Sequence, residues 1–270
     1  MIPADGQNRA GLEPVLRLLS EGAIEVEGLI PWSSNATLLV TVRDGAGSAL
    51  AIYKPQRGER PLWDFPHGTL GRREVAAYLV AEALACRADR DHRDPRQGTR
   101  QGTRGCWGLI PPTVLRDGPY GSGSVQLFVE AQEEANFFTI QDDARYADDL
   151  KRLAALDVIC NNADRKAGHC LVDLDGRLWA IDNALTFHVE PKLRTVIWDF
   201  AGAPLPAPIV SDLERLLGLL AEPEAGLSRP LEGLLSEQEV AALTRRTRDL
   251  ISARRYPAPG PYRAVPWPLV

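Results

Sequence analysis

The sequence has no run of about 18 apolar residues, the length that a membrane-crossing helix needs, so no spanning helix is expected. It also lacks an excess of positive charge. Its 31 Lys and Arg are set against 36 Asp and Glu, and a net charge of −5 argues against broad nucleic-acid binding. No basic stretch followed by an apolar one opens the chain, so no signal peptide is expected and the predicted location is cytoplasmic.

Cysteine is scarce, and the four present form no CxxC pair. A cytosolic location would keep Cys86, Cys106, Cys160 and Cys170 as reduced thiols. Cys160 and Cys170 flank His169 at spacings that fit no zinc pattern, so buried structural cysteines are expected.

The overall composition is typical of a globular protein, since 44% of the residues are hydrophobic and 25% are charged. A length of 270 residues allows one large domain or two lobes. Apolar spacing, turn signals and helix formers predict a β-rich first half and a helical second half. The expected strands are 24–30, 36–43, 48–54, 112–116 and 124–130, and the expected helices are 10–21, 71–86, 143–160, 208–222 and 236–255.

This pattern predicts an α+β protein with a cleft between two lobes, residues 1–130 and residues 131–270. Residues 87–105 are charged and Gly-rich and contain QGTR twice, which favours a solvated insertion in the first lobe. The stretch GPYGSGS at 118–124 resembles a glycine-rich phosphate loop, but no helix follows it, so a hairpin connection is the preferred interpretation.

The segment NNADRKAGH, residues 161–169, gathers acid, base and amide groups between an apolar helix and a strand. The hairpin after it contains Asp175-Gly176, which suits a two-residue turn. A two-residue turn there would pair 172 with 179 and 169 with 182, so that His169 and Asp182 face each other beside Asp164.

In protein kinases a catalytic Asp stands five residues before a metal-binding Asn, and a second metal-binding Asp follows. Asp164 and His169 have that spacing, with His in the Asn position, and Asp182 falls where the later Asp belongs. Phosphoryl transfer needs cations that bridge the phosphates and a carboxylate that positions the nucleophile. Asp164 could supply that carboxylate, and His169 and Asp182 could hold a cation.

A kinase also needs a cation on the phosphates, and Lys54 ends a predicted strand in the β-rich lobe. Glu74 on the following helix is its expected partner, with Glu82 as the rival. The loop between the first two strands contains Ser33, Ser34 and Asn35. These residues either cover the phosphates, as a glycine-rich loop does elsewhere, or form a simple turn.

Four stretches together resemble the phosphatidylinositol 3/4-kinase-like branch of the protein-kinase superfamily: AIYKP, REVAAYLVAEAL, LDVICNNADRKAGH and LWAIDNALTF. That branch has a strand Lys, then D-x-x-x-x-N-x-D-R-x-x-x-N, then I-D-[HN]-[GA]. The broad resemblance covers about residues 25–200. The motifs NNADRK, GH and LRTVIWDF are similar, over nearly the whole chain, to a small actinobacterial family within that branch.

The resemblance implies a bilobal protein-kinase-like fold that binds ATP, with the adenine near Val129 and Glu130. By position, Asp164 would be the catalytic Asp and Lys54 the phosphate-binding lysine. Asn162 would support the catalytic loop.

It further implies a divalent cation, Mg²⁺ or Mn²⁺, at Asp182 and His169. The chain departs from the pattern at His169, which replaces the metal-binding Asn, and at Ala184, which replaces a common glycine. Magnesium favours oxygen ligands, whereas imidazole suits manganese, zinc and similar ions. The histidine at position 169 therefore affects which metal ion is expected and whether the protein is expected to be active.

The expected function is that of an ATP-dependent phosphotransferase. The alternative is a nucleotide-binding pseudokinase that acts as a regulatory or scaffolding module, and other transfers such as nucleotidylation come third. The sequence leaves the acceptor open between a protein and a small molecule, with a lipid possible, since fold and substrate separate easily.

Overall fold

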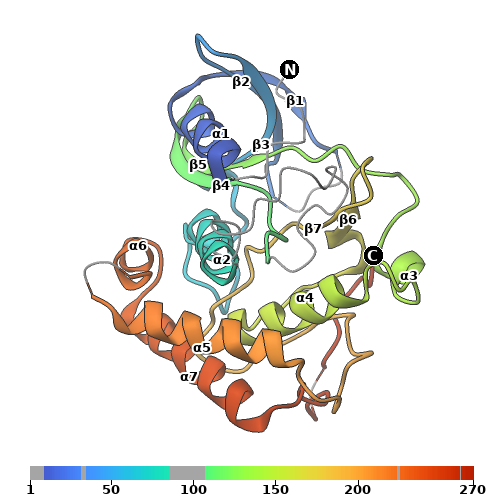
Figure 1. The fold of residues 1–270 in the computed structure, drawn as a ribbon. Coiled ribbons are helices and arrows are strands. Elements are labelled where there is room, and N and C mark those ends of the chain that lie inside the picture. The colour runs from blue at the N-terminus through green and yellow to red at the C-terminus, as the bar shows by residue number, and fades with distance from the viewer. Residues whose placement is uncertain (1–8, 32–34, 86–106, 224–225, 262) are drawn as a thin grey trace, which may run out of the picture.

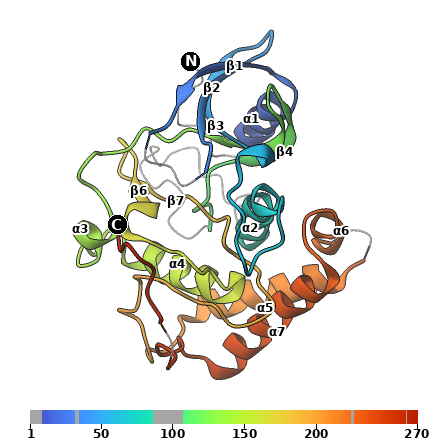
Figure 2. The same cartoon turned by 180° about the vertical axis from the view of Figure 1, so that it is seen from behind.

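The computed structural model of the chain describes residues 9–31, 35–85, 107–223, 226–261 and 263–270. These residues form two lobes, one built on an antiparallel sheet and the other mainly helical, as expected (Figures 1 and 2). The predicted insertion at 87–105 lies outside the described residues. In the described part of the chain, no helix is both long enough and apolar enough to span a bilayer.

The sheet of the first lobe has, among the described residues, five strands in the order β1-β2-β3-β5-β4, each antiparallel to its neighbours. Helix α1 packs on one face of this sheet through Leu18 and Leu19, against core residues that include Val40 and Tyr53. The elements are α1 (Arg9–Glu21), β1 (Ala23–Leu29), β2 (Leu38–Arg43), β3 (Ser48–Pro55), β4 (Thr113–Gly118) and β5 (Gly121–Leu127), with a short 3₁₀ helix, η1 (Gln56–Gly58), after β3.

The Gly-rich stretch at 118–124 is a hairpin, as predicted, because Gly118 pairs with Gly121 across a two-residue turn. The following residues belong to β5. Gly123 is required there, since a Cβ atom at this position would overlap the backbone of Lys54 and Pro55 on β3. This close approach brings the end of β3, with its lysine, against β5.

Helix α2 (Leu70–Leu84) lies between the sheet and the helices of the second lobe (Figures 1 and 2). It is buried around most of its surface, and Val80 and Leu84 belong to the core of the second lobe. Arg215 donates to the carbonyls of Ala83 and Leu84 at its C-terminal end. The helix therefore joins the two lobes instead of belonging to the sheet alone.

The second lobe packs α4 and α5 against α7 around one core of leucines, among them Leu153, Leu213 and Leu243. Helix α7 begins with the predicted capping box, in which Ser236 and Glu239 each accept the other's backbone N–H. The elements are α3 (Phe137–Ile140), α4 (Ala147–Cys160), η2 (Ala167–His169), β6 (Cys170–Val172), β7 (Leu178–Ala180), α5 (Ala207–Ala221), α6 (Ser228–Glu232) and α7 (Glu237–Ala253).

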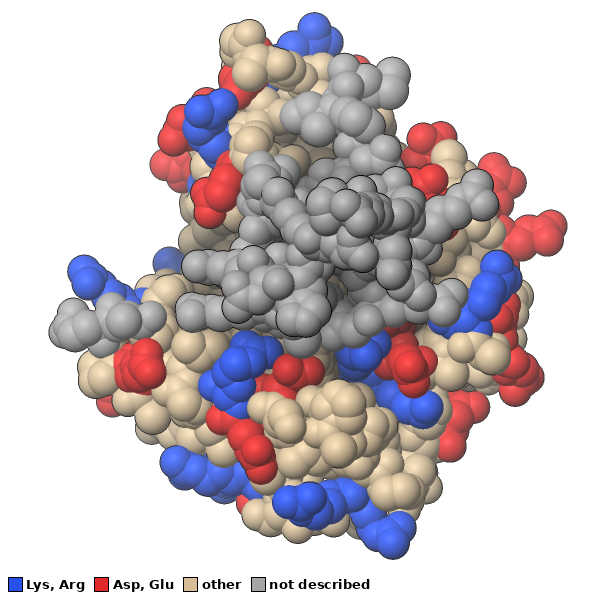
Figure 3. Space-filling view, viewed as in Figure 1, with Lys and Arg blue, Asp and Glu red and all other residues tan. Residues whose placement is uncertain are grey.

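Figure 3 shows one face of the molecule, on which Lys and Arg are interspersed with Asp and Glu over both lobes. The part of this face that the structure describes therefore carries charges of both signs. Cys160 and Cys170 are buried and free, as expected, while Cys86 and Cys106 lie outside the described residues.

Candidate active site

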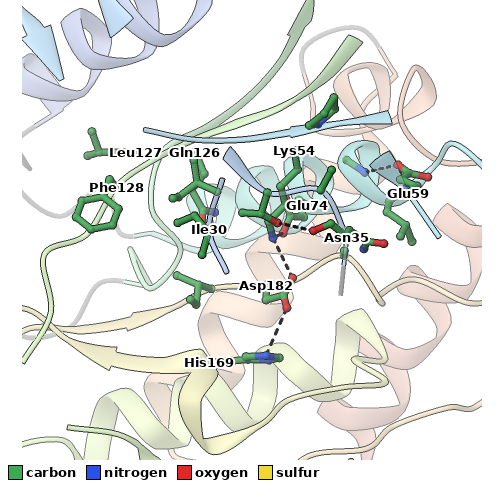
Figure 4. Close-up of a pocket in the computed structure, with 18 of the residues that line it drawn as sticks. Ile30, Asn35, Lys54, Glu59, Glu74, Gln126, Leu127, Phe128, His169 and Asp182 are labelled. Atoms are coloured by element: carbon green, nitrogen blue, oxygen red, sulfur yellow. Dashed lines mark hydrogen bonds and ion pairs between the residues drawn. The ribbon is translucent and has the colours of Figure 1, made fainter. Parts of the chain in front are cut away.

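A cavity of about 280 Å³ lies between the lobes. Strands β3 and β5 and helix α2 form its walls on the side of the first lobe, and η2, β6 and the segment after β7 form them on the other (Figure 4). One end is apolar, with Ile30, Phe128 and Leu171, and the other end holds the charged residues Lys54 and Asp182. A cleft with an apolar end and a charged end suits a ligand of the same two-part character.

Lys54 is the centre of the charged end. Its Nζ lies 2.6 Å from Glu74 Oε1 and 2.9 Å from Asp182 Oδ1 (Figure 4). Burial alone would lower the pKa of Lys54, but the carboxylates of Asp182 and Glu74 outweigh it and hold the pKa above its ordinary value. The lysine is therefore a permanent cation with two carboxylate partners.

Glu74 is the partner of Lys54 because its position on α2 faces the cavity. Its side chain is 2% exposed, and its second oxygen accepts a hydrogen bond of 2.8 Å from Ser124 on β5. Glu82, the rival at the sequence level, stands about two turns further along α2, away from the end of β3. The Lys54–Glu74 pair thus ties α2 to the sheet.

Asp182 follows β7 in a left-handed backbone conformation, with φ of 56°, which non-glycine residues seldom adopt. The Lys54 ammonium holds the pKa of Asp182 well below its usual range, against the opposing effect of burial. Its other oxygen lies 3.4 Å from His169 Nε2. The carboxylate therefore bridges the lysine of the first lobe and the histidine of the second.

The predicted register of the β6–β7 hairpin is wrong by one residue. Val172 pairs with Leu178, not with Trp179, and the carbonyl of His169 accepts from Ile181 instead of standing opposite Asp182. The loop is longer because the Asp173 carboxylate accepts hydrogen bonds from backbone N–H groups beyond it.

Those donors are the N–H groups of Asp175 and Arg177, at 3.0 and 2.8 Å. An Asp side chain that accepts a hydrogen bond from the backbone N–H two residues later favours a turn longer than two residues. His169 and Asp182 still meet, since the chain turns at Asp182 after leaving the strand.

His169 is a neutral imidazole at pH 7, because burial lowers its pKa to about 4 although the Asp182 carboxylate opposes the shift. Its Nδ1 accepts the backbone N–H of Lys166 at 3.4 Å, so the ring proton lies on Nε2 and points toward Asp182. Metal ligation through Nε2 requires the other tautomer, which would leave two donors facing each other at Nδ1.

Asn162 holds the loop that carries Asp164. Its side chain is buried, donates to Asp157 Oδ1 at 3.0 Å and accepts from the N–H of Asp164 at 2.9 Å. Asp157 also forms a buried ion pair with Arg165, whose guanidinium donates to the carbonyl of Ile181 just before Asp182. One network therefore positions both Asp164 and Asp182.

Asp164 is not among the described residues that line the cavity, although its carboxylate interacts electrostatically with that of Asp182, which does. Its nearest charged partner is Lys166, with Nζ 3.4 Å from Oδ2. Burial raises the pKa of Asp164 to about 6, and the nearby Asp182 carboxylate adds to the shift against the opposing Lys166. A carboxyl group with a pKa close to neutral can accept a proton more readily than an ordinary aspartate.

Of the other residues predicted to bind the nucleotide, some line the cavity and others do not. Asn35 and Val129 line the cavity, and Asn35 Oδ1 accepts the N–H of Arg60 at 2.9 Å. Glu130 is exposed and is not among the described lining residues. Ser33 and Ser34 lie outside the described residues.

Sequence reasoning missed most of the residues toward the apolar end of the cavity, among them Ile30, Leu171 and the polar Gln126. The signal was available in part. Residues on the same face of a strand recur every second position, so Ile52 could have been placed beside Lys54 on β3. Ile30 and Leu171 had no such signal, because they come from different lobes.

Within the described ranges, no group of three or more His, Cys, Asp or Glu side chains is arranged to hold a metal ion. Asp182 offers a carboxylate oxygen at the charged end of the cavity, with His169 beside it, and the carboxylates of Glu59 and Glu74 line the same cavity. Such a site fits a cation that takes its remaining ligands from phosphate and water, as Mg²⁺ does in kinases.

Comparison with solved structures identifies the class of fold. The chain is similar to the structure of hydra Fam20 with sugar, with a TM-score of 0.52 and 16% identity over 92% of this chain and 89% of that one. It is also similar to the Golgi casein kinase with Mn/ADP bound, with a TM-score of 0.52 and 15% identity over 92% of this chain and 76% of that one. The fold is therefore protein-kinase-like and bilobal.

No model of a known protein family matches the chain. It is, however, 35% identical over 297 residues to Protein Rv2133c of Mycobacterium tuberculosis (strain ATCC 25618 / H37Rv). The match covers 96% of this chain and 98% of that protein, and the chain belongs to the same family as Protein Rv2133c.

Proposed function

We propose that this protein is an ATP-dependent phosphotransferase that works in the cleft between its two lobes. The observation that carries the proposal is the contact of Lys54 with both Glu74 and Asp182 at the charged end of the cavity. On a kinase-like fold, a strand lysine paired with a helix glutamate is the arrangement that holds nucleotide phosphates. Residues 1–130 would supply this lysine and residues 131–270 the catalytic loop.

The nucleotide would lie with its base at the apolar end and its phosphates at Lys54. Ile30 and Leu171 approach that end from the two lobes, and Val129 follows β5 at its edge. Asn35 would lie on the side of the phosphates, with Ser33 and Ser34 before it in the same loop. Glu130 would contribute from the connection between the lobes.

Asp182 is the residue that we propose to hold a divalent cation, Mg²⁺ or Mn²⁺, and His169 would join it in the tautomer protonated on Nδ1. When bound, such a cation bridges the phosphates and neutralises the charge that develops on them. The Golgi casein kinase structure with Mn/ADP is consistent with nucleotide and metal use on this fold. The low pKa of Asp182 keeps its carboxylate ionised for this role.

Asp164 would orient the acceptor group and take its proton, while Asn162 holds the loop in place. The raised pKa of Asp164 supports this role, since it makes the carboxylate a stronger base than an ordinary aspartate. We further propose that the family belongs to the phosphatidylinositol 3/4-kinase-like branch, on the motif that runs from Asp157 to His169. The acceptor would be a protein or a small molecule, with a lipid as a further possibility.

Incubation with ATP labelled on the α- or the γ-phosphate, with magnesium, manganese or zinc, tests the proposal. Transfer of the γ label to a protein or small-molecule acceptor, or its release to water, is the expected result. Transfer of the α label would instead identify a nucleotidyl transferase. Absence of both, with nucleotide still bound, would leave only the second candidate below.

The second candidate is a nucleotide-binding pseudokinase that acts as a regulatory or scaffolding module. The observation that favours it is His169, whose Nε2–H points toward Asp182 where a kinase has an asparagine oxygen. Retention of Lys54, Asp164 and Asp182 favours the first candidate, because a scaffold has no need of all three.

A further inference from the structure

We infer that Gln126 selects the base of the nucleotide by presenting its side-chain oxygen, Oε1, as a hydrogen-bond acceptor to an amino group. The inference rests on the proposed nucleotide binding and adds the residue that distinguishes one purine from another. Gln126 is 6% exposed and lines the cavity, and none of the roles above uses it.

The register of the sheet places Gln126 at the apolar end. On β5, Gln126 stands opposite Ile52 and Ser124 opposite Lys54, so residues 124 and 126 face the same side of the sheet. Ser124 points to Glu74, which fixes that side as the one toward the cavity. Figure 4 shows Gln126 near Ile30, at the end of the cavity away from His169.

Hydrogen bonding fixes which end of the Gln126 amide faces the cavity. Thr113 Oγ1 donates its only proton to the carbonyl of Pro111 at 2.7 Å, and a carbonyl can only accept. The same hydroxyl lies 2.8 Å from the Gln126 amide and can therefore only accept there. The group that faces Thr113 must therefore be the NH₂ of Gln126.

Once the NH₂ is held by Thr113, the acceptor Oε1 is the atom left for a ligand. No hydrogen bond among the described residues uses this oxygen, although Gln126 is nearly buried beside apolar side chains such as Ile52. Oε1 is also absent from the buried side-chain atoms without a partner in the described residues, so it is open to the cavity, where a donor on a ligand can bond to it.

Adenine carries an amino group at position 6, which is a donor, whereas guanine carries a carbonyl oxygen, which is an acceptor. The Gln126 oxygen can accept a hydrogen bond from the adenine amino group, but it repels the carbonyl oxygen of guanine. The fixed amide therefore favours adenine, and the discrimination depends on Thr113 as much as on Gln126, since without the Thr113 hydroxyl the amide could turn its NH₂ to the cavity.

Purine riboside triphosphate, which is ATP without the amino group, isolates this contact. Dissociation constants of ATP and this analogue, measured by calorimetry with Mg²⁺ or Mn²⁺, should differ about tenfold in the unmodified protein, the worth of one hydrogen bond in an apolar site. In Gln126→Leu the two ligands should bind within about twofold of each other, and Thr113→Val should give an intermediate ratio.

Thr41→Val is the matched control, because Thr41 is a buried threonine on β2 that bonds Glu27 and is not among the described residues lining the cavity. In Thr41→Val, the ratio of the dissociation constants of the two ligands should equal that of the unmodified protein. The same ratio in Gln126→Leu as in the unmodified protein would overturn the inference, and so would equal binding of both ligands by the unmodified protein. Should Gln126→Leu fail to fold, an unchanged ratio in Thr113→Val would overturn it equally. Binding of neither ligand by the unmodified protein would overturn the proposed function as well.

Discussion

Arg73 on α2 forms a buried ion pair with Glu239 in the first turn of α7. The guanidinium is 1% exposed and also donates to the carbonyl of Thr186 at 2.6 Å, in the segment after Asp182. The next residue, Glu74, points the other way, to Lys54. Two neighbouring residues thus connect α2 to both lobes, so the Lys54–Glu74 contact depends on how α2 is anchored to the second lobe.

The first prediction concerns this anchor. Glu239→Gln keeps the capping box at the start of α7 but removes the charge that Arg73 faces, and a buried guanidinium without its partner is costly. We expect the free energy of unfolding in urea to fall by about 2–4 kcal/mol. Nucleotide binding should weaken as well, because α2 also carries Glu74.

The exposed pair of Arg145 with Asp143 is the control. Asp143→Asn removes a charge from a solvated pair, so the unfolding curve should hardly move. Equal effects of the two substitutions would show that the Arg73–Glu239 pair contributes no more than a surface contact.

The second prediction concerns Lys54. Lys54→Met removes the cation that we propose to hold the phosphates. The apparent affinity for ATP with a divalent cation, obtained from the stabilisation of the protein, should therefore decrease at least tenfold. Thermal unfolding over a range of ATP concentrations measures this. Lys151→Met, which removes a lysine that pairs with the exposed Asp148 on α4, should leave the response to ATP unchanged. A Lys54→Met protein that responds to ATP like the unmodified one would place the phosphates elsewhere.

The third prediction follows from the raised pKa of Asp164. Since its pKa in the folded protein is about 6, against an ordinary value of 3.8, the folded state disfavours the ionised form. The cost is fully present above pH 6 and disappears as the pH falls below 4. Asp164→Asn should therefore stabilise the protein at pH 7.5 by about 1–2 kcal/mol, after allowance for partial exposure, and have little effect at pH 4.

The same substitution separates chemistry from binding. Turnover of the unmodified protein should fall below pH 6, and Asp164→Asn should remove most of it while leaving nucleotide affinity within a few-fold. Asp182→Ala should reduce both, because it removes the carboxylate that we assign to the metal. Equal losses of nucleotide affinity in the two variants would mean that these roles are assigned wrongly.

The fourth prediction concerns His169. His169→Asn introduces the amide that kinases have at this position, so magnesium-dependent turnover should be preserved or increased. His169→Ala should lower metal affinity, whether the ring binds the metal or only orients Asp182. Because the pKa of His169 is about 4, nucleotide affinity should not strengthen between pH 8 and pH 5.5, as it would if an imidazolium held the phosphates. Unchanged metal and nucleotide binding in both variants would make the residue purely structural.

Several elements could be predicted from local signals alone. The capping box at Ser236 and the hairpin in the Gly-rich stretch at 118–124 appear as expected, because each depends on side chains and backbone groups a few residues apart. The β6–β7 register could not be predicted, since the Asp173 carboxylate competes with the Asp175-Gly176 turn and both signals are local. The balance between two such signals depends on the packing of the strands.

By itself, the sequence determined which residues we propose to carry chemistry and their order along the chain, because the spacing from Asp164 to His169 and the lysine at the end of a strand are one-dimensional patterns. Only the tertiary structure decided which groups touch. It chose Glu74 as the partner of Lys54, set the tautomer of His169 through a backbone N–H, and turned the Gln126 amide through Thr113. Each of these depends on the direction of a hydrogen bond or ion pair in the folded chain, between separate elements for Glu74 and Gln126 and within the turn at 166–169 for His169. No pattern along the sequence specifies that direction.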